Sequence, residues 1–327
     1  MDFKKRIKIV PRANLYTEED YFVWCGTMFK FNDAYYMIYS RWEKSLGFQA
    51  WVTDSKVCLA KSDTLEGQFH HVKELFDYRG NSPEERRVIH NPAAIVYEGK
   101  VYLYFMMTYG TGDYWENRNR QRIGVAYTDD PEGEWVRLPN PAIDITPGGI
   151  DSLMTSNPTA TIMPDGKILM IYKAVSTEGE LPKGGAVIIG AAVADSPLGP
   201  FHKYGKPQFV NPEASWSVED PFVWYEDGWY YALAKDYNGF FTKVKTHWSG
   251  STALFRSQNG LDWEPDPEHP LAYMNELEFD DGEKVTLQSL ERPQIFIEDG
   301  KTKALLCACR YNKDDNVTYN VKIPLDY

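Results

Sequence analysis

The sequence lacks several features that would assign it to common functional classes. Its 327 residues include only four cysteines, and none of them forms a Cys-x-x-Cys pair, which argues against a cysteine metal site or a disulfide framework. No apolar run approaches the ~20 residues needed to span a bilayer, and no Gly-x-Gly-x-x-Gly turn is present to cradle a dinucleotide phosphate. We therefore expect a protein with no membrane span, no metal site and no redox cofactor.

Positive charge is also scarce. Lys and Arg number 35 against 47 Asp and Glu, which leaves a net charge of −12, whereas a protein that binds nucleic acid needs a basic face. Nucleic acid is therefore excluded as a partner. The one basic cluster, Arg118, Arg120 and Arg122, either meets an anionic group on a small ligand or lies in a solvated loop with compensating charges. Residues 1–6 lack the apolar core of a secretory signal, which favours a cytoplasmic protein unless a signal has been removed.

A motif that returns five times is the main feature that is present. Each copy is a short turn followed by an apolar run, a Gly or Asp turn and a second apolar run. The copies begin at Trp24-Cys25-Gly26, His90-Asn91-Pro92, Ser156-Asn157-Pro158, Glu219-Asp220-Pro221 and Glu291-Arg292-Pro293, at intervals of 63 to 72 residues. Two apolar runs joined by such a turn are typical of a β-hairpin. The regular spacing predicts a repeat architecture.

A repeat of about 66 residues with four short strands is typical of a propeller blade. We therefore predict an all-β protein in which residues 1–327 form a single domain, a five-bladed β-propeller. Its innermost strands should start near residues 24, 90, 156, 219 and 291. The fifth copy is too short for a full outer hairpin, so we expect an N-terminal strand at Lys5–Val10 to complete the last blade and close the ring.

Equivalent positions of the five blades should converge at one mouth of the central channel. The residues expected there are Trp24, His90, Ser156, Glu219 and Glu291, each followed by a second residue of the ring, which is Cys25, Asn91, Asn157, Asp220 or Arg292. Buried polar groups of this kind are paired or functional. For the Asn and Asp residues, the alternative is that their side chains bond nearby backbone at the start of a strand.

The two carboxylates of this ring, Glu219 and Glu291, indicate acid–base chemistry. Glycoside hydrolysis needs two carboxyl groups that flank the bond to be cleaved. Aromatic rings cover the apolar faces of sugars, and several lie near the ring, although they also suit packing between blades: Trp42, Phe48, Trp51, Tyr114, Trp115, Trp216 and Trp248. Arg41 and His247 are candidate ligands for sugar hydroxyls. Lys173 and Lys235 either pair with the acids or lie exposed at strand ends, which is the interpretation we favour.

Glu219-Asp220-Pro221, the apolar segment up to Tyr231 and the recurrent Ser/Thr-Asp-x-Pro-x-Gly-x-aromatic signature resemble the five-bladed propeller glycosidases of glycoside hydrolase families 43, 32 and 117. The resemblance covers all five blades and implies that Glu219 is the general acid, which needs a raised pKa. Burial beside Asp220 would raise it. Cys25 and Asn157 stand where family 43 keeps two further carboxylates, so the chain resembles an outlying group of this clan. In such groups a His can take an acid role, here His90, and some relatives hold a calcium or sodium ion in the channel.

A replacement base or nucleophile must then be Asp151, which could instead cap a turn, or Glu291. We predict an exo-acting glycosidase that cleaves a terminal bond of a small oligosaccharide, with Glu219 as acid and His90 orienting or donating. Trp24, Arg41, Trp42, Asn91, Asn157, Asp220, His247 and Arg292 are the predicted substrate-binding residues. One alternative is a phosphorylase that resembles family 130, with the Arg118–Arg122 cluster binding phosphate. The other is a carbohydrate-binding propeller without catalytic activity.

Overall fold

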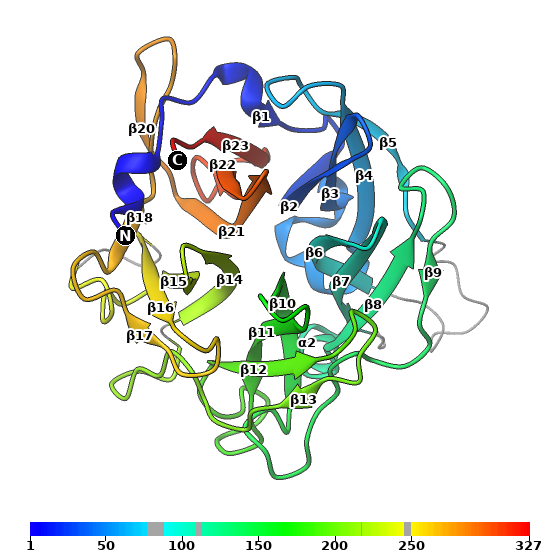
Figure 1. The fold of residues 1–327 in the computed structure, drawn as a ribbon, viewed down its shortest axis with the longest axis vertical. Coiled ribbons are helices and arrows are strands. Elements are labelled where there is room, and N and C mark those ends of the chain that lie inside the picture. Colours follow the sequence, from blue (N-terminus) through cyan, green and yellow to red (C-terminus); the bar gives the residue numbers. More distant parts are fainter. Residues whose placement is uncertain (77–87, 109–112, 217, 245–249) are drawn as a thin grey trace.

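The computed structural model describes residues 1–76, 88–108, 113–216, 218–244 and 250–327. Its strands form five antiparallel sheets that stand around a central axis (Figure 1). The predicted five-bladed propeller is therefore confirmed. Within these ranges, no helix is long and apolar enough to cross a membrane.

The blades follow one another along the chain, and each runs outward from the axis. Blade 1 contains β2 (Tyr21–Phe31), β3 (Ala34–Glu43), β4 (Lys56–Ser62) and β5 (His70–Glu74), and blade 2 contains β6 (Val88–Tyr97), β7 (Lys100–Thr108), β8 (Arg122–Thr128) and β9 (Val136–Arg137). Blade 3 contains β10 (Met154–Ile162), β11 (Ile168–Val175), β12 (Ile188–Ala194) and β13 (His202–Lys203). Blade 4 contains β14 (Val218–Glu226), β15 (Trp229–Asp236), β16 (Ser251–Ser257) and β17 (Glu264–Pro265), with β18 (Leu271–Met274) also paired to β16. Blade 5 contains β21 (Ser289–Glu298), β22 (Lys301–Arg310), β23 (Tyr319–Pro324) and, from the other end of the chain, β1 (Leu15–Tyr16).

Short helices and one hairpin connect or cover the blades. The helices are η1 (Phe3–Arg6), η2 (Arg12–Asn14), η3 (Lys44–Leu46), η4 (Phe48–Ala50), α1 (Trp51–Asp54) and α2 (Tyr114–Asn119), and the hairpin pairs β19 (Glu276–Glu278) with β20 (Lys284–Thr286). η4 and α1 follow the second strand of blade 1, and α2 follows the second strand of blade 2. These three helices therefore belong to equivalent connections of neighbouring blades.

The hydrophobic core lies between the blades. The innermost strands contact one another in a closed ring, in the order β2, β6, β10, β14 and β21. Each gap between neighbouring blades is filled by apolar side chains of the pleated sheets, as where Ile38 and Leu59 of blade 1 pack with Leu103 and Phe105 of blade 2. Because alternate residues of a strand face opposite sides of its sheet, one strand supplies side chains to both of its neighbouring gaps.

Each innermost strand carries a β-bulge at the same repeat position. The residue after the predicted anchor has a positive φ in every blade: 57° at Cys25, 52° at Asn91, 46° at Asn157, 57° at Asp220 and 56° at Arg292. The strand register shifts at each of these points. A bulge locally disrupts the ladder and re-aims side chains, and it does so here five times around one axis.

The N-terminal segment closes the ring, but with a different strand from the one predicted. Leu15 and Tyr16 of β1 pair with Val321 and Asn320 of β23, which makes β1 the outermost strand of blade 5. The predicted strand at Lys5–Val10 was right only in part, because Ile7 forms an isolated bridge with Leu325 and Lys8 N donates to Pro324 O of β23 at 3.0 Å, but the segment forms no continuous strand. Lys5 lies in the 3-10 helix η1, and Val10 bonds with the hairpin region through Glu278 O and Asp280 N instead of with β23.

Candidate active site

The starts of the innermost strands surround a pocket of about 150 Å³ at one mouth of the channel. The lining residues come from all five blades, and most of them carry a polar or charged atom. The described lining residues are Trp24, Trp42, Phe48, Trp51, His90, Asn91, Tyr114, Arg118, Asn157, Lys173, Trp216, Glu219, Asp220, Tyr237, Glu291 and Arg292. The predicted convergence of equivalent positions is therefore present in the structure.

The five bulged residues form a chain of contacts around the axis. The thiol of Cys25 donates to Asn91 Oδ1 at 2.8 Å, Asn91 Nδ2 to Asn157 Oδ1 at 2.6 Å, and Asn157 Nδ2 to Asp220 Oδ1 at 2.7 Å. Arg292 Nη1 donates to the same Asp220 oxygen at 3.2 Å. All five side chains are nearly inaccessible to solvent. The side chains that meet at the axis are therefore those of the residue that follows each predicted anchor.

Asp220 and Arg292 are the charged members of this chain of contacts. Burial raises the pKa of Asp220 above its usual value, and the Arg292 guanidinium only partly opposes that shift. Arg292 keeps two buried nitrogens, Nε and Nη2, without a hydrogen-bond partner in the described part of the chain.

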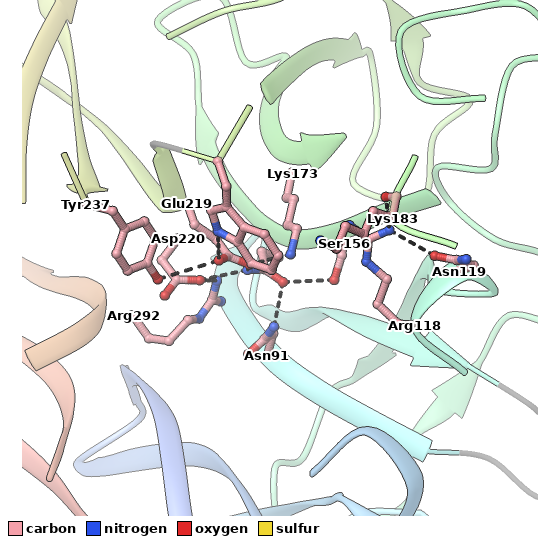
Figure 2. Close-up of polar contacts among 12 residues, drawn as sticks. Asn91, Arg118, Asn119, Ser156, Lys173, Lys183, Glu219, Asp220, Tyr237 and Arg292 are labelled. Atoms are coloured by element: carbon pink, nitrogen blue, oxygen red, sulfur yellow. Dashed lines mark hydrogen bonds and ion pairs between the residues drawn. The ribbon is translucent and has the colours of Figure 1, made fainter. Parts of the chain in front are cut away.

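Glu219 precedes Asp220 in β14, and cationic and polar neighbours hold its carboxylate. Lys173 of β11 forms an ion pair with Oε1 (Figure 2). Trp216 Nε1 donates to Oε2 at 3.1 Å. Tyr237 OH is 3.5 Å from the same Oε2 atom. Burial raises the pKa of Glu219, but the Lys173 ammonium and the Trp216 hydrogen bond outweigh it and bring the pKa below its usual value. The predicted raised pKa of Glu219 was therefore wrong, because Lys173 reaches across from blade 3.

Glu291 occupies the equivalent position in blade 5 and has the opposite electrostatic environment. Burial and the negative charge of Asp220 raise the pKa of Glu291 to about 7, although Lys235 opposes the shift. Lys235 is fully buried, donates to Asn275 Oδ1 at 2.7 Å, and has its own pKa lowered by burial to about 8. The pocket therefore combines an ionised glutamate with one that keeps its proton near neutral pH.

His90 lines the pocket as a neutral side chain. It is 3% exposed, its Nδ1 lies 2.8 Å from Ser55 Oγ, and its ring stacks on Trp51 at a centroid distance of 5.1 Å. Burial and the Arg292 charge lower its pKa well below the usual value. An uncharged imidazole fits the orienting role predicted for His90 better than the role of acid.

Two predicted site residues lie away from the pocket. Asp151 is buried, where Lys203 Nζ at 2.6 Å, Tyr172 OH at 3.0 Å and the Thr146 amide satisfy its carboxylate. The structure thus removes Asp151 as the base, because it is committed to contacts within blade 3. Arg41 forms ion pairs with Glu18 and Glu74 away from the pocket, so it does not serve as a sugar ligand there.

His247 lies outside the described residues. The other predicted substrate-binding side chains, Trp24, Trp42, Asn91, Asn157, Asp220 and Arg292, all line the pocket. Among the described residues, no group of three or more His, Cys, Asp or Glu side chains is placed to hold a metal ion.

Sequence reasoning misjudged the lysines and missed Tyr237. Lys173 and Lys235 are buried and meet the acids of the pocket, whereas we expected them to be exposed. The strand register places Lys173 opposite Ser156 and Lys235 opposite Glu219, at equivalent points of blades 3 and 4. This equivalence, in two otherwise apolar strands, is the signal that could have identified both residues. Tyr237 follows β15, and no signal in the sequence pointed to it.

Comparisons with known proteins identify the fold more clearly than the family. No family model matches the sequence, and a search of curated proteins finds no match. Among solved structures, BT0996 in a complex with RGII is similar with a TM-score of 0.68 at 16% identity, over 99% of this protein and 91% of that one. Zg3597, a family 117 glycoside hydrolase of the marine bacterium Zobellia galactanivorans, has a TM-score of 0.63 at 17% identity, over 98% and 89%. A GH43_1 enzyme of Xanthomonas citri complexed with xylotriose has a TM-score of 0.61 at 15% identity, over 95% and 90%. The protein therefore has the five-bladed propeller fold of the glycoside hydrolases of families 43 and 117.

Proposed function

We propose that the protein hydrolyses a terminal glycosidic bond of a small oligosaccharide in the central pocket. The observation that carries this proposal is the pair of glutamates with opposite environments. Glu219 is ionised beside Lys173, and Glu291 keeps its proton to about pH 7. Two carboxyl groups whose environments drive their pKa values apart mark the acid and the base of a hydrolytic site.

In this proposal Glu291 is the proton donor and Glu219 is the base or nucleophile. The Glu291 proton passes to the leaving oxygen as the bond from that oxygen to the anomeric carbon breaks. Glu219 either takes a proton from the attacking water or attacks the anomeric carbon itself, and water then releases the sugar. The assignment reverses the roles implied by sequence resemblance, because Lys173 favours the charged form of Glu219. The step involves no change of oxidation state, so it calls for no redox cofactor.

The walls of the pocket support a sugar as the ligand. Trp24, Trp42, Trp51 and Trp216 present aromatic surface to it, and Asn91 and Asn157 add polar atoms near the axis. Aromatic faces cover the C–H surfaces of sugars, and a few placed polar groups fix the hydroxyls. The side chains of the bulged residues contact one another at the axis. This arrangement favours a pocket that is closed at its inner end, and such a pocket favours cleavage at the end of a sugar chain.

The first test is the release of sugar from a panel of aryl glycosides and oligosaccharides, with and without inorganic phosphate. We expect turnover without phosphate, and a loss of about 10²-fold or more in Glu219→Gln. Glu276→Gln is a matched control, because Glu276 is exposed in the β19–β20 hairpin. Turnover that requires phosphate would favour a phosphorylase, for which the cations Arg118, Lys173 and Arg292 of the pocket are the relevant observation. Sugar binding without any cleavage would favour a propeller that only binds carbohydrate.

A further inference from the structure

Two of the three Lys and Arg side chains that line the pocket pair with a carboxylate. Lys173 pairs with Glu219, and Arg292 pairs with Asp220. Arg118 also lines the pocket, yet within the described ranges it forms no ion pair with a carboxylate. The guanidinium of Arg118 therefore brings a positive charge to the pocket that the described residues do not pair.

Arg118 is held rigidly in this position. It lies on α2, whose start is capped by Asp113 Oδ1 accepting from the Glu116 amide at 2.9 Å. Its Nη1 atom donates to Lys183 O at 2.8 Å and to Asn119 Oδ1 at 2.9 Å, so the side chain is fixed between blade 2 and the loop of blade 3 (Figure 2). Both acceptors are uncharged. Among the described residues, Arg118 donates hydrogen bonds through Nη1 alone, so Nε and Nη2 are the atoms that could donate to a ligand.

A buried guanidinium without an anion is costly. Arg118 is 4% exposed, and burial lowers its pKa from the usual value, although the charge of Glu219, which makes no ion pair with it, opposes the shift. Desolvating a charge costs several kcal/mol unless a partner of opposite charge compensates. A neutral sugar brings no charge to compensate this cost, whereas an anionic ligand does.

The other two members of the basic cluster do not share this property. Arg120 pairs with Glu116 at 2.9 Å, and Arg122 pairs with Asp144 at 2.7 Å. Neither of them lines the pocket. Of the three arginines, only Arg118 lines the pocket, whereas Arg120 and Arg122 have compensating charges.

We propose that Arg118 binds the carboxylate of an acidic sugar, so that the substrate of this pocket is a uronide and not a neutral glycoside. This inference rests on the proposed function and specifies its substrate class. A guanidinium offers a planar pair of N–H donors that matches the two oxygens of a carboxylate. The carboxylate on the sugar ring would also place the ring relative to Glu219 and Glu291, because Arg118 is itself fixed by its backbone and Asn119 contacts.

The test compares matched substrates. Aryl glucuronides and galacturonides are assayed beside the corresponding glucosides and galactosides, and the ratio of kcat/KM for acidic over neutral substrate is measured. We expect wild type to favour one of the uronides by about 10- to 100-fold, the range given by hydrogen bonds to a charged group. Arg118→Met should lower the ratio by a similar factor, and Arg118→Lys should retain part of it. Arg120→Met, at the residue that follows the same helix, is the matched control and should keep the wild-type ratio.

Binding of the free sugars separates the failure of this inference from the failure of the proposed function. Calorimetry with glucuronate and galacturonate against glucose and galactose needs no turnover. Tighter binding of a uronate, weakened in Arg118→Met, supports the inference even if no glycoside is cleaved. Equal or better use of the neutral sugars by wild type overturns it, and so does binding of inorganic phosphate alone that is lost in Arg118→Met. If Arg118→Met fails to fold, the preference of wild type and of Arg118→Lys decides the question.

Discussion

Glu219 and Glu291 are the same residue type at equivalent positions of neighbouring blades, yet their surroundings give them opposite protonation states. Lys173 contacts Glu219 directly, whereas Lys235 is bonded to Asn275 and acts on Glu291 only through its charge. Burial and the negative charge of Asp220 both oppose the ionisation of Glu291. The division of roles therefore arises from burial and from the neighbouring side chains, and not from the glutamates themselves.

The pH dependence of activity should report these two groups. We expect kcat/KM to fall as the pH rises above about 7, because Glu291 then loses the proton that it must donate. Activity should also fall at low pH, where Glu219 becomes protonated. Lys173→Met should move the acidic limb to higher pH, since removing the ammonium raises the pKa of Glu219. Lys167→Met, which changes an exposed lysine paired with Asp165, is the control. An acidic limb that does not move would contradict the role given to Lys173.

Asp151 provides a prediction about stability. We expect Asp151→Asn to lower the free energy of unfolding by about 2 kcal/mol, because it removes the charge that pairs with the partly buried Lys203. Unfolding in urea measures this change. Catalytic activity of the folded variant should stay close to wild type, since Asp151 does not line the pocket. A loss of about 10²-fold in kcat with unchanged stability would restore Asp151 as a candidate base.

At the scale of the element, the bulge of the innermost strand is the device that builds the site. It recurs in all five blades and places the side chains of Cys25, Asn91, Asn157, Asp220 and Arg292 near the axis. Asn and Asp tolerate a positive φ better than most residues, and three of the five positions carry them. The identity of the residue is thus constrained by the backbone as well as by the hydrogen bonds.

The bulge predicts an unusual order of substitution effects at Asn91. Both Asn91→Gly and Asn91→Val remove the side-chain hydrogen bonds, but valine is also strained at a φ of 52°. We expect the valine variant to be less stable than the glycine variant by about 1–2 kcal/mol. At Ala94 on the same strand the order should reverse, since glycine weakens a regular strand. Thermal unfolding of the four variants decides, and the same order at both positions would count against a structural role for the bulge.

The elements were more predictable from sequence than the chemistry of the site. The repeated anchors located the five innermost strands, because a turn, an apolar run and a second turn are local patterns. The pKa of Glu219 depends on Lys173, which is distant in the chain and becomes its neighbour only when blades 3 and 4 pack together. Asp151 precedes β10 and contacts Tyr172 of β11 and Lys203 of β13, so its partners within blade 3 also depend on the tertiary fold. Sequence patterns place side chains on strands, but they do not pair side chains across blades.

At the scale of the whole molecule, the ring is closed by the N-terminal segment. β1 pairs with β23, and Phe3 and Val10 are fully buried in the core cluster of blades 4 and 5. Arg6 also joins two blades, since its Nη1 atom contacts Glu226 of blade 4 and Thr302 of blade 5. The stability of the last blade thus depends on residues from the opposite end of the sequence.

Removal of residues 1–16 should therefore weaken the entire propeller. We expect the midpoint of thermal unfolding to fall by at least about 5 °C, because two buried apolar side chains and the outer strand of blade 5 are lost. Ile9→Ser is the control, since Ile9 is 54% exposed and its replacement leaves the segment in place. An unchanged midpoint in the truncated protein would show that ring closure does not depend on this segment.

In the proposed mechanism, Glu291 donates the proton and Glu219 acts as base or nucleophile. This assignment is tested most directly by cleavage rates on an aryl glycoside series, from dinitrophenyl to phenyl leaving groups, for wild type, Glu219→Gln and Glu291→Gln. A good leaving group needs no proton. We therefore predict that Glu291→Gln cleaves the dinitrophenyl glycoside well but loses about 10²-fold or more on the phenyl glycoside, while Glu219→Gln is impaired on both. The reverse pattern, with Glu219→Gln rescued by the good leaving group, would contradict this assignment and make Glu219 the acid.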